Sequence, residues 1–402
     1  MLRALLLRTV VLVVVCVSPS LRAAEEERVE ELAELLLQNP LFESVMLSPD
    51  GSHLAMFLYR NGVRTLGTYD LQRKQLRIAK VDRGESVYRF GWLDEDRVIF
   101  AVDYWGIYHA RLMLIDESMR RKVEHLDANR GSQLLMFVDG LPWIRRQAIA
   151  IDVQAKPYRT FFRYEYPRGF RTMSSNREML HDYAFDRAGN WRVKTIGRGE
   201  ANAYDAFHRK DDEAEWEPID LPEIARLYDF APDSDILYAT HRHGSPRAVF
   251  QGYDLSQQAY VGGAISDPHY AVFPSLMRAH DTGEMVGLFY EADRPVVLYT
   301  DPAVGQVAQM LKRALPDQFH VYLGVRQEGG LLFYSWSDRQ PGIVHELDLE
   351  NRALKRVLET RPKIDASAMA AKHPFAFPAR DGVTVRGYYT LPPGVEPDKA
   401  AG

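Results

Sequence analysis

The stretch Leu47-Ser48-Pro49-Asp50-Gly51 places a proline and an Asp-Gly pair between two apolar runs, which is the chemistry of a tight turn between strands. An acidic turn residue recurs at nearly even spacing along the chain, at Asp50, Asp94, Asp139, Asp186, Asp233, Asp281 and Glu328. The successive separations are 44, 45, 47, 47, 48 and 47 residues. A period in the forties is typical of propeller or solenoid arrays, in which each unit buries its apolar face against its neighbours.

Short apolar runs follow these turns. They cover residues 54–59, 98–102, 148–151, 236–239, 285–290 and 331–336, while the fourth unit alternates through Trp191, Val193 and Ile196. In most units a second acidic marker stands 20 to 22 residues after the first, at Asp70, Asp116, Asp254, Asp301 and Asp348. Two turns at a fixed phase predict a four-stranded meander in each unit. We therefore predict an all-β fold with a seven-bladed β-propeller over residues 41–366. Unrelated hairpins in a sandwich would not show this constant separation between the two turns of each unit.

The bulk composition is that of an ordinary globular chain. Its 402 residues are 46% apolar and 26% charged, which is enough to bury a large core. A formal net charge of -5 and a pI near 6.2 give no basic field that would hold a polyanion. The local pair Arg145-Arg146 is typical of a solvated surface. Nucleic acid is therefore not an expected partner.

Residues 1–24 have the pattern of a secretory signal peptide. A basic start at Arg3 precedes an apolar stretch of about 13 residues, shorter than the roughly 20 that a membrane span requires, and small residues follow. The only cysteine, Cys16, lies in this stretch without the small residues that a lipid-attachment box has before it. We expect export to a periplasm or the cell exterior, with no stable membrane span after processing; a retained anchor is the alternative.

Residues 25–40 are predicted to form an amphipathic helix ahead of the repeats. The apolar positions at helical spacing are Val29, Leu32, Ala33, Leu36 and Leu37. The first turn of this segment is acidic, and Asn39-Pro40 ends it. Such a helix needs a surface on which to place its apolar side, either the propeller or a partner domain.

Several clusters of polar residues suggest ion sites but lack the necessary pattern. His241-Arg242-His243 has no second pair of ligands nearby in sequence, so a solvent-exposed loop pair is favoured. His345-Glu346 begins like a zinc-binding helix motif, but Leu349 occupies the place of the second histidine. Asp233-Ser234-Asp235 and Asp211-Asp212-Glu213 do not continue into a calcium loop. No metal ion or cofactor is expected.

The pattern changes in residues 367–402. Between His373 and Gly394 the sequence contains two alternating stretches joined by Arg380-Asp381-Gly382, which predicts a strand pair with a tight turn. The second stretch ends in Gly387-Tyr388-Tyr389-Thr390-Leu391-Pro392. This segment is not an eighth repeat.

With the repeats before it, this segment resembles the prolyl oligopeptidase family of serine peptidases, especially its acylaminoacyl-peptidase and dipeptidyl-peptidase-like members. In that family a propeller is followed by an α/β-hydrolase domain that opens with an Arg-Asp-Gly turn and a Gly-Tyr-x-x-Leu-Pro strand. The resemblance implies that the propeller caps the active site, admits short peptides and excludes folded proteins. It also implies that residues 367–402 are the first strands of a hydrolase domain.

The residues of the catalytic machinery are not found in this sequence. The family's nucleophile lies in a Gly-x-Ser-x-Gly turn, and the nearest match, Gly84-Glu85-Ser86-Val87-Tyr88, has tyrosine where the second glycine is required. Only 28 residues run from Phe375 to Gly402. We therefore assign no catalytic residue and expect the chain to be inactive alone, with the missing hydrolase domain as its partner. The alternative is a stand-alone propeller that binds ligands in the cell envelope.

Two further expectations concern ligands and the chain end. The resemblance to dipeptidyl peptidases suggests that an acidic cluster such as Asp211-Asp212-Glu213 binds the amine of a peptide, although turn chemistry is the simpler interpretation. Aromatic residues such as Tyr104-Trp105 and those of residues 158–166 are expected to pack in and between the blades, with some facing a peptide-sized opening. Without a partner sheet, the final strands are expected to be disordered or prone to association.

Overall fold

The computed structural model describes residues 30–104, 107–114, 123–125, 135–138, 147–152, 160–174, 179–199, 203–279, 282–392 and 395. The predicted signal peptide with Cys16, the pair Arg145-Arg146 and the markers Asp116, Asp139 and Asp281 lie outside these residues. The chain divides into two compact units, residues 1–39 and 40–402. The first contains a helix over residues 30–37, and none of the described helices is both long and apolar enough to cross a membrane.

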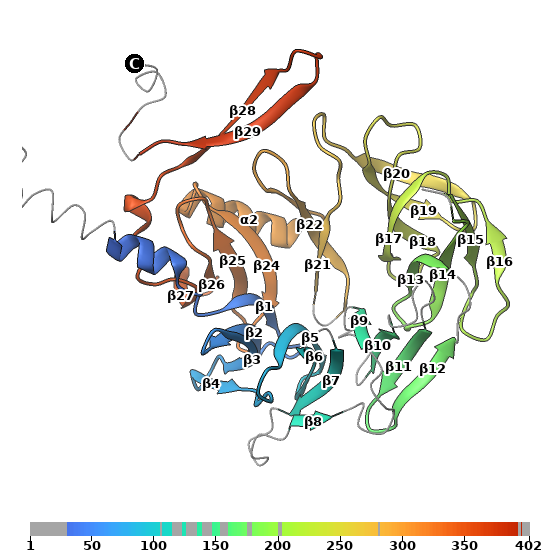
Figure 1. The fold of residues 1–402 in the computed structure, drawn as a ribbon, viewed down its shortest axis with the longest axis horizontal. Coiled ribbons are helices and arrows are strands. Elements are labelled where there is room, and N and C mark those ends of the chain that lie inside the picture. Colours follow the sequence, from blue (N-terminus) through green and yellow to red (C-terminus); the bar gives the residue numbers. More distant parts are fainter. Residues whose placement is uncertain are drawn as a thin grey trace, which may run out of the picture. The chain divides into compact units, whose positions relative to one another are not determined.

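In its described residues the second unit contains seven larger sheets in chain order, each an antiparallel meander of consecutive strands (Figure 1). The first sheet comprises β1 (Glu43–Leu47), β2 (His53–Arg60), β3 (Val63–Asp70) and β4 (Gln75–Ile78). The second comprises β5 (Ser86–Asp94), β6 (Arg97–Tyr104), β7 (Ile107–Leu114) and β8 (Val123–His125). The third comprises β9 (Leu135–Val138), β10 (Gln147–Asp152), β11 (Thr160–Glu165) and β12 (Gly169–Ser174).

The remaining sheets follow the same plan with one exception. The fourth comprises β13 (Leu180–Phe185), β14 (Trp191–Gly197), β15 (Tyr204–His208) and β16 (Glu217–Ile219). The fifth comprises β17 (Ile224–Phe230), β18 (Ile236–His241), β19 (Val249–Asp254) and β20 (Ala259–Ile265). The sixth has three described strands, β21 (Ser275–Arg278), β22 (Met285–Tyr290) and β23 (Val296–Tyr299). The seventh comprises β24 (Phe319–Val325), β25 (Leu331–Trp336), β26 (Ile343–Asp348) and β27 (Ala353–Glu359).

The sixth sheet departs from the predicted four-stranded pattern because the helix α2 (Pro302–Ala314) follows β23. Asp301, predicted to close a hairpin, is instead the N-cap of this helix: its carboxylate accepts a hydrogen bond of 2.9 Å from the amide of Val304. Pro302 occupies the first helical turn, where backbone N–H groups have no acceptor within the helix. The N–H that proline lacks therefore costs no helical hydrogen bond. The helix buries Val304, Val307, Ala308 and Leu311, which have the helical spacing of one apolar face. The prediction of a hairpin strand here was wrong. An aspartate followed by proline is common both in turns and at the start of helices, and here it begins a helix.

The first turn shows why the repeat signature contains serine, aspartate and glycine. The Ser48 hydroxyl accepts hydrogen bonds from the amides of Ser52 and His53 at 3.1 and 2.9 Å, and donates one of 2.7 Å to the Asp50 carboxylate. Gly51 has a φ of +73°, a conformation that costs other residues about 1 kcal/mol or more. Its carbonyl accepts a hydrogen bond of 3.1 Å from the Gln327 amide of the seventh sheet. The turn therefore also connects the first sheet to the last.

Apolar clusters pack each sheet against its neighbours in the chain. Six clusters of described residues each draw on two consecutive sheets, with members such as Phe57 and Trp92, Ile99 and Tyr164, Met173 and Phe185, Val193 and Leu227, Phe250 and Leu288, and Val286 and Phe333. A seventh cluster joins Leu47 and Leu54 of the first sheet to Leu332 and Val344 of the seventh. Burying a large apolar side chain contributes about 1.5–3 kcal/mol, so these junctions hold the sheets together.

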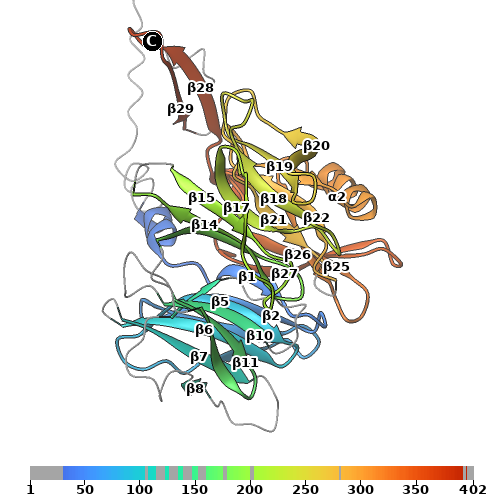
Figure 2. The ribbon, with the colours of Figure 1, turned by 90° about the vertical axis from the view of Figure 1, so that its right-hand side faces the viewer.

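The segment after the seventh sheet forms a hairpin. A short 3-10 turn, η1 (Ala366–Ala368), precedes β28 (Lys372–Pro378) and β29 (Thr384–Thr390), which pair along their full lengths. The predicted Asp-Gly turn joins them: the Val383 amide donates to Asp381 at 3.1 Å, and Gly382 has a φ of +81°. Figure 2 shows the hairpin extending away from the neighbouring sheets. A formed hairpin replaces the expected disorder; a tendency to associate stays a prediction.

Candidate functional site

Ser86, the serine of the partial nucleophile motif, does not lie on a strand-to-helix turn. It is the first residue of β5 and pairs across the ladder with Asp103. The preceding Glu85 is buried and accepts a hydrogen bond of 3.0 Å from the Asp82 amide, which closes an ordinary turn. The geometry that exposes a catalytic serine above a sheet is not present at this position.

Two other serine hydroxyls in the described part of the chain lie close to a histidine. Ser52 Oγ is 2.7 Å from His53 Nδ1, and His53 Nε2 is 3.7 Å from Asp70. However, the Ser52 hydroxyl lies equally close, at 2.7 Å, to the carboxylate of Asp50, which holds it in the turn network described above. The amides of Ser52 and His53 already bond to Ser48, so neither is available to stabilise an oxyanion.

The second pair is buried in the seventh sheet. Ser335 Oγ lies 2.9 Å from His320 Nδ1, and the Ser335 side chain has no solvent exposure. His345 on the adjacent strand β26 is also buried, and burial lowers the pKa of both His320 and His345 to about 4. Neutral imidazoles shielded from solvent in this way belong to the core rather than to a reaction site. The motif His345-Glu346 lies on a strand, and Glu346 pairs with Arg326 at 2.8 Å.

The structure corrects the interpretation of His241 as one of a solvent-exposed pair. His241 ends β18 with 2% exposure, stacks on Tyr260 at a ring distance of 3.5 Å and lies 3.2 Å from the Gln251 side chain. His243 is exposed and also stacks on Tyr260, at 5.8 Å. Burial lowers the pKa of His241, which favours its neutral form. In the described residues no three His, Cys, Asp or Glu side chains are grouped so as to hold a metal ion.

The two acidic clusters are tied into turns and ion pairs. Asp211 accepts hydrogen bonds of 3.0 Å from the amides of Glu213 and Ala214, which is turn chemistry. Asp212 pairs with Arg163 at 2.8 Å and with Arg209 at 2.7 Å. This carboxylate joins the third sheet to the fourth, so it is already neutralised and does not offer a site for a peptide amine.

The cluster Asp233-Ser234-Asp235 is likewise structural. Asp233 has a φ of +44°, and the Ser234 hydroxyl accepts a hydrogen bond of 3.2 Å from the Ile236 amide. Asp235 pairs with Arg192 of the fourth sheet at 2.6 Å. Of the predicted packing aromatics, Tyr164 is buried between the second and third sheets, whereas Trp105 and residues 153–159 lie outside the described residues.

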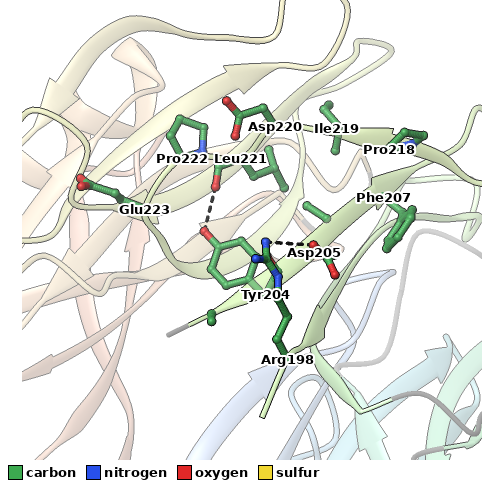
Figure 3. A pocket seen from close by; sticks show the side chains of 12 residues that line it. Arg198, Tyr204, Asp205, Phe207, Pro218, Ile219, Asp220, Leu221, Pro222 and Glu223 are labelled. Atoms are coloured by element: carbon green, nitrogen blue, oxygen red, sulfur yellow. Dashed lines mark hydrogen bonds and ion pairs between the residues drawn. The ribbon is translucent and has the colours of Figure 1, made fainter. Parts of the chain in front are cut away.

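A pocket of about 450 Å³ lies beside the end of β15 (Figure 3). Strand β16 pairs with β15 only up to Ile219, after which the chain leaves the sheet and opens a gap towards Tyr204. Pro218, Ile219, Leu221 and Pro222 supply apolar walls, and Arg198, Asp205, Asp220 and Glu223 supply charges. Arg198 and Asp205 form an ion pair of 2.9 Å, and both are more than half exposed. No motif or spacing in the sequence predicted this pocket.

Three tyrosines fix the wall of the pocket formed by residues 220–224. Tyr204 donates to the Leu221 carbonyl and accepts from the Ile224 amide, each at 2.7 Å. Tyr260 donates to the Pro222 carbonyl at 2.8 Å, and Tyr253 to that of Asp220 at 2.5 Å. Burial raises the pKa of Tyr204 and Tyr260, and raises that of Tyr253 to about 12, so all three stay protonated donors at neutral pH. The wall is therefore held from both the fourth and fifth sheets.

The terminal hairpin has two different faces. One, the aromatic face, carries alternate residues of each strand. These are His373, Phe375 and Phe377 of β28, and Val385 and Tyr389 of β29. Phe375 stacks with Phe377 at 6.1 Å, yet these two are 39% and 48% exposed. The other, the polar face, contains Lys372, Arg386 and Tyr388. It faces the loop between β22 and β23, where Arg386 lies 3.4 Å from Asp293. An exposed apolar surface of this kind is typical of an interaction site.

Comparison with solved structures shows what this arrangement resembles. A prolyl endopeptidase, one of two studied for inter-domain dynamics in catalysis and specificity, matches with a TM-score of 0.60 at 10% identity, over 94% of this chain and 61% of its own. A post-proline cleaving enzyme from Rickettsia typhi matches with a TM-score of 0.56 at 10% identity, over 92% of this chain and 60% of its own. Prolyl oligopeptidase B from Galerina marginata matches with a TM-score of 0.55 at 10% identity, over 94% of this chain and 60% of its own.

The chain has the fold of the N-terminal portion of prolyl oligopeptidases. This confirms, for the fold, the resemblance predicted from the repeats and the terminal segment. The chain spans about 60% of the length of these structures. No protein-family model matches the sequence, and no curated protein matches it.

Proposed function

We propose that the chain is the propeller portion of an exported serine peptidase of the prolyl oligopeptidase type. The observation that carries this proposal is the likeness to prolyl endopeptidases over 94% of this chain but only 61% of the solved one. In this proposal the catalytic serine, aspartate and histidine belong to an α/β-hydrolase domain, and residues 367–402 begin it. The aromatic face of the hairpin is the surface on which further strands of that domain pack.

The seven sheets are, in the same proposal, the blades of a seven-bladed propeller. The apolar cluster between the first and seventh sheets supports closure, as do the hydrogen bonds from Gln327 to Gly51 and from Leu41 to Thr360, at 3.1 and 2.8 Å. Blades joined by buried clusters at each junction resist separation, because opening one exposes large apolar side chains. A propeller of this kind admits short peptides and excludes folded proteins. Its proposed location is the periplasm or the cell exterior.

The test is an assay with matched chains. The coding sequence is read beyond Gly402, and the chain is produced with and without the following region. We expect that region to supply a Gly-x-Ser-x-Gly motif. The longer product should hydrolyse short proline-containing peptides and react with a fluorophosphonate at its serine, whereas residues 1–402 alone should do neither. Hydrolysis by the shorter chain, with labelling of one of its own serines, would contradict the proposal.

A second candidate function, a propeller that binds ligands without catalysis, is favoured by the pocket beside β15. The charged side chains around it are one arginine and three carboxylates, so the pocket favours a cationic group such as the side chain of a basic peptide. Calorimetric titration with a lysine-containing dipeptide tests this function. The variant Glu223→Gln should weaken binding, and Glu350→Gln on a distant exposed turn is the control. Equal heats for both variants, or none for the unmodified chain, would remove this candidate.

A further inference from the structure

We propose that Tyr270, Asp293 and Arg386 form a latch that determines which face of the terminal hairpin is presented to solvent. Arg386 lies on the polar face of the hairpin, Tyr270 in the loop before β21 and Asp293 in the loop between β22 and β23. The contact is a property of residues 1–402 by themselves. Only its consequence for a hydrolase domain rests on the proposed function.

The acceptor of the latch is the carboxylate of Asp293. One of its oxygens, Oδ2, lies 3.4 Å from the Arg386 guanidinium, and the other, Oδ1, accepts a short hydrogen bond from the Tyr270 hydroxyl. The guanidinium also lies 5.6 Å from the centre of the Tyr270 ring, within cation-π range. Each of the three side chains therefore contacts the other two. The hydrogen bond to Asp293 raises the pKa of Tyr270, so its hydroxyl stays a donor.

The loop side of the latch is positioned in advance. Asp267 accepts hydrogen bonds from the amides of His269 and Tyr270, at 2.8 and 2.9 Å, and its second oxygen lies 3.4 Å from the Tyr290 hydroxyl. These bonds tie the loop that carries Tyr270 to strand β22. The backbone at Tyr270 is thus held by bonds that do not involve the hairpin.

The hairpin has a second attachment at its base. The Lys372 amide donates a hydrogen bond of 2.7 Å to Asp338, in the loop after β25. Tyr388, beside the latch, donates one of 3.2 Å to the Ala292 carbonyl, and the Lys372 ammonium lies 4.4 Å from the centre of the Tyr388 ring. The base contact alone fixes a point about which the hairpin can turn. The latch, together with the Tyr388 hydrogen bond beside it, adds the second point that fixes its rotation.

This arrangement has a consequence for the aromatic face. With the polar face held on the loop of Asp293, the aromatic face points outward and stays exposed. Burial of exposed aromatic surface is favourable, so a released hairpin is expected to turn this face towards neighbouring apolar surface. The Asp293 and Arg386 side chains are 37% and 27% exposed, so the ion pair is modest in strength and weakens with salt. The latch therefore gives a weak, reversible preference rather than a fixed orientation.

The experiment follows the hairpin in the 402-residue chain by hydrogen exchange of residues 372–390 and by the rate of tryptic cleavage after Arg380. In Asp293→Asn, both rates should rise about two- to fivefold, the range for an exposed ion pair. The matched control is Glu165→Gln, which removes the exposed ion pair of 2.9 Å with Arg168 in the third sheet. This control should leave both rates unchanged.

Two further measurements separate a latch from a general loosening of the loop. Arg386→Gln should give the same increase in exchange as Asp293→Asn, and the double variant should add nothing to either. Raising sodium chloride to a concentration that screens ion pairs should accelerate exchange in the unmodified chain but not in Asp293→Asn. Unchanged rates in either single variant, additive effects in the double variant, or an equal rise in Glu165→Gln would each overturn the proposal. None of these outcomes depends on whether a hydrolase domain follows.

Discussion

The seven sheets and the terminal hairpin contain similar strands but bury their aromatic residues to very different extents. Trp92 and Phe333 in the sheets are 1% and 0% exposed, whereas Phe375 and Phe377 in the hairpin are 39% and 48% exposed. Strand β25, which carries Phe333, and the strands of the hairpin both pair in regular ladders. The difference lies in what covers them, because buried apolar clusters pack the sheets against one another, whereas the hairpin has one attached face. Strand pattern alone therefore does not make a stable core.

The largest contrast should appear at two glycines of the first sheet. Gly51 and Gly62 have nearly the same φ, +73° and +76°, but a Cβ on Gly51 would lie 2.6 Å from the Gln327 amide nitrogen, while nothing lies within 4 Å of one on Gly62. Gly51→Ala forces the backbone of the first and seventh sheets apart and should cost about 5 kcal/mol, against about 1 kcal/mol for Gly62→Ala. Chemical unfolding monitored by tryptophan fluorescence measures both. Similar losses for the two variants would show that the two sheets do not meet closely here.

The next contrast compares a buried and an exposed phenylalanine directly. Phe333→Ala opens a cavity between the sixth and seventh sheets and should lower the free energy of unfolding by about 3–5 kcal/mol. Phe377→Ala removes a half-exposed ring from the hairpin and should cost less than about 1 kcal/mol. Denaturation midpoints of the two variants give the comparison. A large loss for Phe377→Ala would mean that something covers the aromatic face in solution.

The repeating sheets and the hairpin could be predicted from the sequence, whereas the helix α2 was not. The even spacing of turn residues such as Asp50 predicted the repeating sheets, because the signal recurs along the chain, and the Asp381-Gly382 turn predicted the hairpin, because its signal is local. The helix α2 was missed although Val304, Val307 and Leu311 stand at helical spacing. The spacing of the repeats predicted a hairpin at Asp301, and the helical spacing of these residues was not taken into account.

The candidate sites could not be predicted, because they depend on contacts between distant residues. The pocket exists because β16 leaves the sheet after Ile219 and Tyr204 bonds to Leu221, 17 positions away. The latch joins Asp293 to Arg386, which are 93 positions apart. No spacing rule connects such pairs, and only the packing of the sheets brings them together. The burial of His241 on Tyr260 was missed for the same reason.

Acid should distinguish the core of the seventh sheet from the hairpin. Burial lowers the pKa of His320 and His345 to about 4, whereas the unfolded chain has histidine pKa values near 6.5. Between these values the unfolded chain binds more protons, so stability is full above about pH 6.5 and falls as the pH decreases towards 4. The expected loss over this window is roughly 3 kcal/mol for each of the two imidazoles.

The measurement is the free energy of unfolding at a series of pH values. His345→Leu should reduce the dependence on pH, because it removes one of the two buried imidazoles. The control variant is His373→Leu on the hairpin, a partly exposed histidine that stacks on Tyr389. An unchanged slope in His345→Leu, or an equal reduction in His373→Leu, would show that the pH dependence arises elsewhere.

The smallest contrast concerns two aspartates that begin different structures. Asp301 caps α2 through the Val304 amide, and Asp381 bonds the Val383 amide in the hairpin turn, at 2.9 and 3.1 Å. Asp301→Ala should cost about 1 kcal/mol of global stability, because it leaves a helix amide unsatisfied and α2 packs on the sixth and seventh sheets. Asp381→Ala should leave the unfolding midpoint unchanged and raise only the exchange rates of the hairpin amides, since the hairpin is not part of that core. If Asp381→Ala lowered the midpoint as much as Asp301→Ala does, the hairpin would be unfolding together with the sheets, and the two regions would form one cooperative unit.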